Sequence, residues 1–409
     1  MSTESPSITG PLHDLTVIDL TQMLAGPYCT MTLADLGADV IKVEPPAGDL
    51  TRHMGPHREG DSPEALGGYF QSVNRNKRSV VLDLKTAAGR TALLRLAATA
   101  DVLVENFSVG VMDRLGLSYE TLSAVNPALV YGCVRGFGDP RTGGSPYADW
   151  PAFDITAQAM GGLVAITGPG PGRPLKTGPG IGDIFPAALC AVGILAAVHE
   201  ARRSGRGQFV EVAMYDAVLS LCERIVYQHS YTGAVPQPQG NTHPLLCPFG
   251  LFPTKDGLLA LAAPSDRHWR EFCALIGRPE LGHDERYATN TGRVAHADAV
   301  RDVVTRWLSS RTTADALAVL GGRVPCGPVN DAAAIFADPH VRERGMLSEV
   351  EQPGSPAPVV IAGQPIKLSR TPSAVRHRAP LLDEHRDEIL SASSAAGDPR
   401  HNTSQGQVQ

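Results

Sequence analysis

The most constraining feature of the sequence is a strand–helix–strand pattern near its start. Residues 15–20 form a short, mostly apolar run of the kind found in buried strands. A turn and a helix-like run over residues 21–36 follow, and residues 39–44 again resemble a strand. Gly37 lies where this helix is expected to stop, because glycine readily adopts the left-handed conformation that ends helices. Two strands joined by a helix predict a parallel pair, which is the unit of an α/β fold.

The same alternation recurs along the first half of the chain. A long helix is expected from Asp183 to about residue 203, with Asp183 as its N-cap and Pro186 in its first turn. Further extended segments are expected at 80–84, 101–105, 129–134 and 209–213, with a helix at 87–99. This order predicts an α/β fold with a Rossmann-like large domain and a mostly parallel sheet.

A change in composition indicates a second domain. Residues 233–253 are rich in Gly, Pro, Gln and Asn, which is typical of a crossing between domains. We therefore expect the first part of the large domain over residues 1–225, a smaller α+β domain over 226–329, and a return to the large domain over 330–395. Residues 396–409 are polar and small, and are expected to form a disordered tail.

Composition narrows the classes of partner. The net charge of −6 over 409 residues, with 5% aromatic residues, gives no reason to expect nucleic acid or an anionic membrane. The seven cysteines are scattered without a C-x-x-C pair, which favours free thiols in a reducing compartment over disulfides or a metal site. The longest apolar run, 184–198, is short for a bilayer and contains Pro186. These features predict a cytoplasmic protein that binds no metal.

The common cofactor and hydrolase motifs are missing. The loop after the first predicted strand, residues 21–27, is not G-x-G-x-x-G, and the chain has no Gly-Lys-Ser/Thr phosphate loop. It also lacks G-x-S-x-G and H-E-x-x-H. The glycine-rich runs 168–172 and 178–182 contain prolines, which remove backbone donors that a phosphate cradle would use. We therefore expect no tightly bound cofactor.

Asp154 opens a small, mostly apolar segment, residues 152–162, directly after a loop rich in glycine and proline. The residues alone leave two interpretations open. Asp is a preferred N-cap, and a carboxylate where a loop meets a helix start commonly has that role. A carboxylate in a partly dry site can instead act as a nucleophile and form a covalent acyl intermediate.

Two further polar groups lie next to predicted strands. The basic segment 74–78 precedes one strand, and is either a solvated turn or an anion site. Glu105, Asn106 and Phe107 end the strand predicted at 101–105. Because ligands in open α/β sheets bind outside the carboxyl ends of the strands, both groups are expected to border one crevice.

A series of short segments resembles the class III CoA transferases, a family that includes the α-methylacyl-CoA racemases. The resemblance extends from about residue 11 to residue 390 and depends on the order and spacing of the segments. They are residues 19–21, 25–27, 36–44, 76–79, 104–107, 153–154 with 158–159, 204–208, 324–329 and 378–382.

The resemblance implies a specific chemistry. Asp154 would attack the thioester carbonyl of an acyl-CoA and give a mixed anhydride, and the CoA thiolate would then form an aspartyl-CoA thioester. A small carboxylic acid would take over the CoA, with succinyl-CoA as a possible donor, so the CoA thioester is a co-substrate. The resemblance also implies an interlocked homodimer, active sites where the large and small domains join, and a closing loop within residues 240–250.

The resemblance further implies a set of CoA contacts. Relatives carry a glutamine where this chain has Leu24, and a lysine where it has Arg135; Gln22 lies close to the first of these positions in the sequence. Arg52 is a further candidate for a phosphate or carboxylate contact. The implied CoA-binding positions are Met23, Leu24, Ala25, Lys77, Asn106, Phe107, Arg114 and Arg135.

Two alternatives compete with CoA transfer. Racemases of the family carry a His before the matching aspartate, and here that residue is Phe153. They also use a second acid, which Asp183 matches, although Asp183 has its own interpretation as a helix cap. Without the His, two-base proton transfer is disfavoured. The other alternative is an inactive acyl-CoA-binding subunit, which the presence of Asp154 disfavours.

Overall fold

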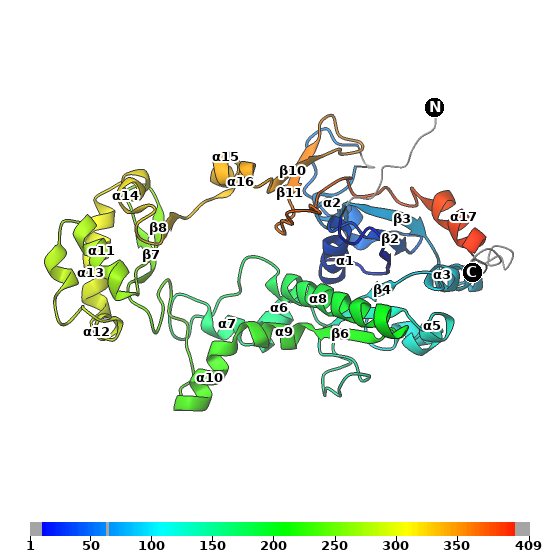
Figure 1. The fold of residues 1–409 in the computed structure, drawn as a ribbon, viewed down its shortest axis with the longest axis horizontal. Helices are drawn as coiled ribbons and strands as arrows, with labels where there is room; N and C mark the ends of the chain where they lie inside the picture. Colours follow the sequence, from blue (N-terminus) through cyan, green and yellow to red (C-terminus); the bar gives the residue numbers. More distant parts are fainter. Residues whose placement is uncertain (1–9, 63–64, 397–409) are drawn as a thin grey trace, which may run out of the picture. The chain divides into compact units, whose positions relative to one another are not determined.

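The computed structural model describes residues 10–62 and 65–396, and the chain divides into two compact units (Figure 1). The first unit comprises residues up to Leu163, Thr177–Tyr227 and the chain from Pro339 onward. The second comprises Val164–Lys176 and Gln228–Asp338. The segment 164–176 thus departs from the expected boundaries, which placed it in the large domain. The expected tail lies outside the described residues, apart from residue 396.

The first unit is built on a six-stranded parallel sheet with the strand order β3-β2-β1-β4-β5-β6. This is the order of a doubly wound Rossmann-type sheet, and it confirms the predicted α/β class. The strands are β1 (Thr16–Asp19), β2 (Asp39–Glu44), β3 (Lys77–Val81), β4 (Val102–Glu105), β5 (Val130–Arg135) and β6 (Phe209–Ala213).

Helices cover both faces of this sheet. Because side chains alternate along a strand, Tyr131 and Gly132 of β5 point to opposite faces. Tyr131 joins the core cluster that includes residues of α3 (Ala87–Ala97), α5 (Tyr119–Val125) and α17 (Arg386–Ala396). Gly132 lies against Ile194 of α8 (Ile181–Ser204), and α8 also packs on α1 (Ala25–Asp35).

The long helix α8 differs from the sequence expectation in its start and its length. It begins at Ile181 with Gly180 as its N-cap, so the prediction of Asp183 as the cap is wrong and Asp183 lies inside the first turn. The helix is long and apolar enough to cross a membrane by length and composition, unlike the shorter run expected. However, Cys190 and Ile194 are fully buried, and the helix contacts β5, β6 and α1, as a core helix does.

The second unit has its own core and an antiparallel sheet. Strands β7 (Phe249–Pro253), β8 (Leu258–Ala262) and β9 (Cys326–Pro328) pair in that order. Trp269, Phe272 and Leu308 are fully buried in its cluster. Its helices include α11 (Asp266–Leu275), α12 (Asn290–Ala295), α13 (Ala297–Ser309), α14 (Thr313–Leu320) and α15 (Ala332–Ala337), with the 3₁₀ turn η2 (Pro279–Gly282).

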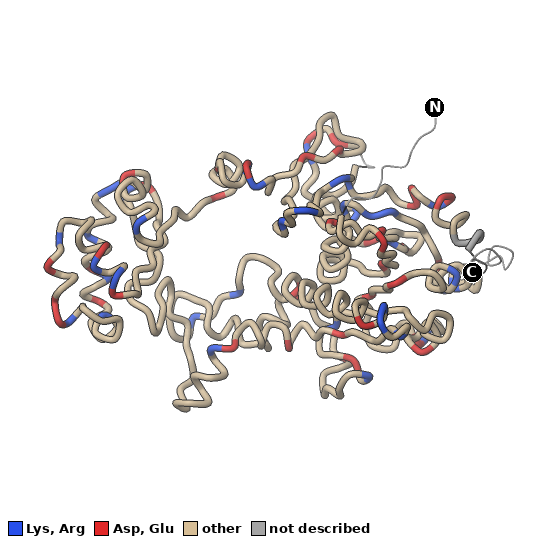
Figure 2. The backbone as a smooth tube through the Cα atoms, in the orientation of Figure 1, with Lys and Arg blue, Asp and Glu red and all other residues tan. Residues whose placement is uncertain are grey.

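The remaining elements connect these layers. In the first unit the hairpin of β10 (Leu347–Val350) and β11 (Val359–Ala362) follows α16 (Pro339–Glu343). The shorter elements are η1 (Leu50–His53), α2 (Gly68–Asn74), α4 (Val111–Arg114), α6 (Asp154–Met160), α7 (Leu163–Ile166), α9 (Met214–Leu221) and α10 (Glu223–Thr232). Acidic and basic residues are interspersed along both units (Figure 2).

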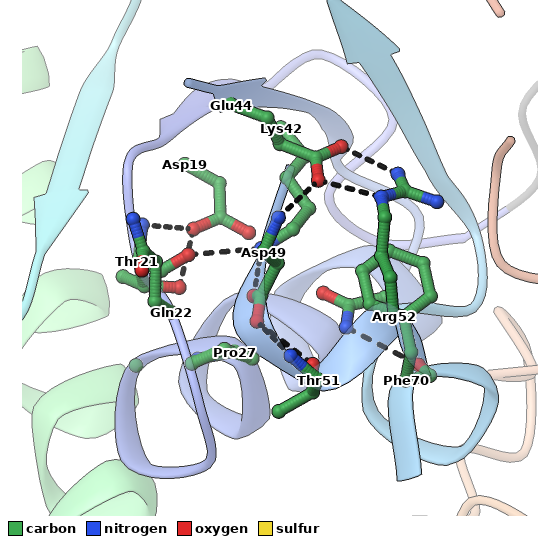
Figure 3. Close-up of polar contacts among 12 residues, drawn as sticks. Asp19, Thr21, Gln22, Pro27, Lys42, Glu44, Asp49, Thr51, Arg52 and Phe70 are labelled. Atoms are coloured by element: carbon green, nitrogen blue, oxygen red, sulfur yellow. Dashed lines mark hydrogen bonds and ion pairs between the residues drawn. The ribbon is translucent and has the colours of Figure 1, made fainter. Parts of the chain in front are cut away.

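Ion pairs are buried where β1, β2 and β3 lie side by side. We call Asp19, Lys42, Glu44, Asp49, Arg52 and Lys77 the buried ionic network. The Lys77 ammonium is 2.8 Å from Asp19 Oδ2, the Lys42 ammonium is 2.9 Å from Asp49 Oδ2, and all four side chains are fully buried. Burial alone would raise the pKa of Asp19, but the two ammonium groups outweigh it and hold that pKa below its usual value. Figure 3 shows the part around Lys42, Asp49 and Arg52.

The network explains why β3 begins at Lys77, three residues before the strand predicted from the apolar run at 80–84. A lysine at a buried strand position is tolerated because its charge is paired. The Lys77 ammonium also donates to Asn74 Oδ1 at 2.9 Å and to the Pro27 carbonyl at 3.1 Å. The basic segment 74–78 is therefore neither a solvated turn nor a free anion site: Arg75 pairs with Asp35, and Arg78 with Asp39.

We predict that Lys77→Met destabilises the first unit by about 3–5 kcal/mol, because it leaves the Asp19 carboxylate buried without its closest cation. The measurement is the free energy of unfolding in denaturant. Lys85→Met removes an exposed lysine from the loop after the same strand and serves as the control. Equal stability of the two variants would contradict a structural role for Lys77.

Candidate active site

Two carboxylates meet where α6 and α8 begin. Asp154 is the first residue of α6, and Asp183 lies in the first turn of α8. The backbone N–H of Gly182 donates to Asp154 Oδ1 at 2.7 Å, which ties the start of α8 to this side chain. We call Asp154 and Asp183 the acid pair.

Asp154 does not cap its own helix. The N-cap of α6 is Phe153, and the Asp154 carboxylate instead accepts a hydrogen bond from one of the first N–H groups of α8. The N-cap interpretation of Asp154 is thus wrong for α6, although the side chain satisfies a free donor of the neighbouring helix. The physical reason is that the chain brings the two helix starts together, which the local sequence does not show.

Gln158 holds the Asp154 carboxylate in place. It lies one turn further along α6, and its Nε2 donates to both carboxylate oxygens, at 2.9 and 2.8 Å. Gln158 Oε1 in turn accepts from the backbone N–H and the hydroxyl of Thr177, at 3.0 and 3.1 Å. The Asp154 carboxylate is therefore fixed in orientation and well supplied with donors.

The surroundings of Asp183 are different. Burial, and then the negative charge of Asp154, raise the pKa of Asp183 to about 7. Across the described ranges 10–62 and 65–396, no protein donor forms a hydrogen bond with the Asp183 carboxylate. The two acids of the pair therefore differ: Asp154 is fixed by hydrogen bonds from the protein, whereas Asp183 is half-buried and has a raised pKa.

The loop after β1 reaches this acid pair. A Cβ atom built on Gly180 would lie 3.0 Å from Leu24 Cδ2 and 3.9 Å from Asp154 Cγ, so Leu24 lies beside Gly180 and the pair. Met23 has a φ of 69°, the left-handed conformation that non-glycine residues rarely adopt. The structure thus brings predicted contact residues 23–25 next to both predicted acids.

Tyr69, on α2, is a polar group that the sequence analysis missed. Burial, followed by the charges of Asp183, Asp49 and Asp154, raises the pKa of Tyr69 to about 12. The phenol therefore stays protonated and lies close enough to the acids to feel their charge. No sequence signal pointed to it, because α2 follows a loop whose path back to the acid pair is set by tertiary structure.

Asn106, Phe107 and Arg135 lie at the same edge of the sheet as the loop after β1. Asn106 follows β4, and its side chain bonds the backbone of Gln22. Arg135 ends β5, pairs with Glu105 at 2.6 Å and donates to the Phe107 carbonyl at 3.0 Å. Segment 105–107 thus lies beside the loop after β1, but the basic segment 74–78 leads into β3 and lies at the opposite edge of the parallel sheet, so the prediction that both segments border one crevice is wrong.

The predicted cationic contacts divide into internal and exposed groups. Lys77, Arg135 and Arg52 are buried in ion pairs, and the Arg52 guanidinium also lies 4.0 Å from the centre of the Phe70 ring. Using any of them for CoA would require a buried pair to open. Arg114, at the end of α4, is exposed. The expected closing loop, residues 240–250, belongs to the second unit, and its last two residues begin β7.

Comparison with known proteins identifies the family of the chain. The family model described as CoA-transferase family III matches residues 12–386. Succinyl-CoA:mesaconate CoA-transferase of Haloarcula hispanica is 51% identical over 381 residues, covering 93% of this chain and 96% of that protein. Succinate–glutarate CoA-transferase of Agrobacterium fabrum is 39% identical over 394 residues, covering 95% and 97%.

A solved structure supports the same assignment. A CAIB/BAIF family protein from Brucella suis superposes with a TM-score of 0.81 at 36% identity, covering 94% of this chain and all of that chain. The similarity extends over both units rather than over the sheet alone. The chain therefore belongs to CoA-transferase family III, as the sequence resemblance predicted.

Proposed function

We propose that this chain transfers CoA from succinyl-CoA to a small carboxylic acid through a covalent intermediate on the acid pair. Relatives named for succinyl-CoA, mesaconate and glutarate support the substrate class. The single observation that carries the mechanism is the Asp154 carboxylate, which Gln158 and the start of α8 hold in one orientation beside a second acid. A reaction that exchanges one thioester for another is nearly balanced, so it needs no external energy source.

We further propose that Asp154 is the attacking carboxylate, the role that the sequence resemblance implies. Gln158 and the Gly182 N–H hold its side chain in one orientation, as a nucleophile that must meet a thioester carbonyl requires. Asp183 is the supporting acid of the pair, because its pKa is raised to about 7 and its carboxyl can be protonated when the thioester is attacked.

The steps balance without a further reactant. An Asp154 oxygen bonds to the thioester carbonyl carbon, the C–S bond breaks, and CoA leaves as the thiolate with its electron pair. The thiolate then attacks the aspartyl carbonyl, releases succinate and leaves an aspartyl-CoA thioester. The acceptor carboxylate attacks this thioester, forms a second anhydride and again frees the thiolate, which takes the acceptor acyl group and restores Asp154.

Donors for the developing oxyanion are close to the pair. Asp183 lies in the first turn of a 24-residue helix, whose N-terminal N–H groups and dipole favour negative charge. The protonated phenol of Tyr69 is a second donor. For CoA itself, the backbone of residues 23–25 and the exposed Arg114 are the contacts that need no buried ion pair to open.

A homodimer in the cytoplasm completes the proposal. Val192 on α8 is 65% exposed, and Leu219 and Leu221 on α9 are also exposed. Large apolar side chains on one unit are typical of surfaces that a partner covers. Racemase chemistry is disfavoured because Phe153, which is 63% exposed, stands where a proton-transferring imidazole would be needed.

The first prediction separates the two acids. Asp154→Asn is expected to abolish CoA transfer and to carry no acyl adduct, whereas Asp183→Asn retains measurable transfer. The measurement is mass spectrometry of peptides after incubation with succinyl-CoA and hydroxylamine, beside the rate of CoA exchange. An adduct on Asp183, or full transfer by Asp154→Asn, would sink the assignment to Asp154.

The second prediction concerns pH. The Asp183 carboxyl is protonated below its raised pKa of about 7 and can then donate to the oxyanion, whereas its ionisation adds a like charge beside the nucleophile. We therefore expect kcat/KM for the donor to fall as the pH rises through about 7. Asp183→Asn cannot ionise at this position, so its pH profile should lack this fall. A fall near pH 7 that persists in Asp183→Asn would show that another group ionises there.

The third prediction concerns stability. The pKa of Asp183 is about 7 in the fold, above the value of about 3.9 expected in the unfolded chain. The unfolded state therefore binds fewer protons, and wild-type stability falls as pH rises between these values. Asp183→Asn cannot ionise and does not lose stability in this way, so the substitution should raise the apparent Tm by a few degrees at pH 8 and by less at pH 4.5. A variant that is less stable than wild type at pH 8 would contradict the burial of a charge at this position.

A further inference from the structure

We infer that Asn106 is a positioning residue whose side chain holds the loop of residues 21–24 against the acid pair. The inference rests on the proposed function, because it assigns a role at the same site. Asn106 Oδ1 accepts from the Gln22 N–H at 2.9 Å, and Asn106 Nδ2 donates to the Gln22 carbonyl at 2.8 Å. One amide thus satisfies both backbone groups of Gln22, as a neighbouring strand would.

The hydrogen bonds between Asn106 and Gln22 join the carboxyl ends of two neighbouring strands. β1 and β4 are neighbours in the sheet, Gln22 follows β1, and Asn106 follows β4. The helix after β1 packs with α8, whereas the helices flanking β4 join the core cluster on the opposite face. This is the topological switch point of an open α/β sheet, where ligands bind beyond the strand ends. The Asn106 side chain therefore joins the two loops that border such a crevice.

Thr21, the residue before Gln22, is also fixed by hydrogen bonds. The N–H of Thr21 donates to Asp19 Oδ1 at 2.9 Å, and the Lys42 ammonium donates to the Thr21 carbonyl at 2.8 Å (Figure 3). Both peptide groups before Met23 are consequently fixed. This fixation is what allows Met23 to keep its left-handed φ of 69°, a conformation that costs about 1–3 kcal/mol.

The loop conformation has a direct consequence for the acids. The turn at Met23 leads into Leu24, whose side chain lies beside Gly180 and the acid pair. An apolar side chain in this place keeps water away from the carboxylates, and burial is the largest cause of the raised pKa of Asp183. Releasing Gln22 would let the loop and Leu24 move away and would admit water.

Asn106 is itself rigidly placed. The N–H of Phe107 donates to Glu105 Oε2 at 2.6 Å, and Arg135 donates to the Phe107 carbonyl at 3.0 Å. The residues on both sides of Asn106 are thus anchored to β4 and β5, which fixes the position of its side-chain amide.

The chain offers a matched control in Asn126. Its Nδ2 donates to the carbonyls of Ala97 and Ala100 at 3.0 and 2.8 Å, and its Oδ1 accepts from the Ala128 N–H at 3.1 Å. Asn126 precedes β5 rather than following a strand, so it ties loops together at the opposite edge of the sheet. It has the same side chain, a similar set of backbone bonds and no contact with the site.

The experiment compares Asn106→Ala with Asn126→Ala. Both should lower the apparent Tm. Only Asn106→Ala should lower kcat/KM for succinyl-CoA, by about 10- to 100-fold as expected for misplaced reacting groups, and shift the fall in kcat/KM near pH 7 to lower pH. Asn126→Ala should keep both within about twofold of wild type. If the Asn106 variant matches the control in kinetics and pH profile, Asn106 is only structural and the inference is overturned.

Two further measurements keep the outcome decisive. If Asn106→Ala does not fold, Asn106→Asp replaces it, because a carboxylate keeps the shape but cannot donate to the Gln22 carbonyl, and the same kinetic changes are expected.

Hydrogen exchange at residues 22–25 without substrate separates the positioning role of Asn106 from the proposed function. Loss of protection in the Asn106 variant but not in Asn126→Ala supports the positioning role even if wild type transfers no CoA, which would refute the proposed function alone. Unchanged protection overturns the positioning role.

Discussion

The buried ionic network determines the conformation of the loop after β1, and the rest of the site depends on that loop. Lys77 pairs with Asp19, Lys42 pairs with Asp49, and all four side chains are without solvent contact. Such pairs add little net stability compared with apolar packing, since desolvation offsets much of the attraction. Their effect here is on the geometry of the backbone. Asp19 accepts a hydrogen bond from the Thr21 N–H, and the Lys42 ammonium donates one to the Thr21 carbonyl. The buried charges of Asp19 and Lys42 therefore fix the backbone of the loop that leads from β1 to the acid pair.

The acid pair illustrates how the environment gives two identical side chains different chemistry. Asp154 receives donors from Gln158 and the start of α8, whereas Asp183 is half-buried near a like charge and accepts no hydrogen bond from the described residues. One carboxylate is therefore held in a fixed orientation, and the other has its pKa raised by burial and by its neighbour. Family membership makes CoA transfer the natural reaction for this pair.

Local patterns predicted the layers of the fold well and the site only in part. The apolar runs before residues 20, 44, 105 and 135 are strands of one parallel sheet, because strand and helix periodicities are local properties. The start of α8 was misplaced at Asp183, since Gly180 takes the cap position and Asp154 supplies the missing acceptor from another helix. Three of the cations expected at CoA, Arg52, Lys77 and Arg135, lie in internal ion pairs, because a sequence does not show which charges are buried together. Tyr69 was missed for the same reason.

The closeness of Asp154 and Asp183 also bears on the energy of any covalent intermediate. Acylation converts one carboxylate into a neutral carbonyl derivative, whichever of the two is modified. Acylation of Asp154 would remove the negative charge that, after burial, helps to raise the pKa of Asp183 in the resting protein. The loss of this like-charge repulsion lowers the free energy of the acylated form relative to the resting site, which narrows the free-energy gap to a reactive anhydride.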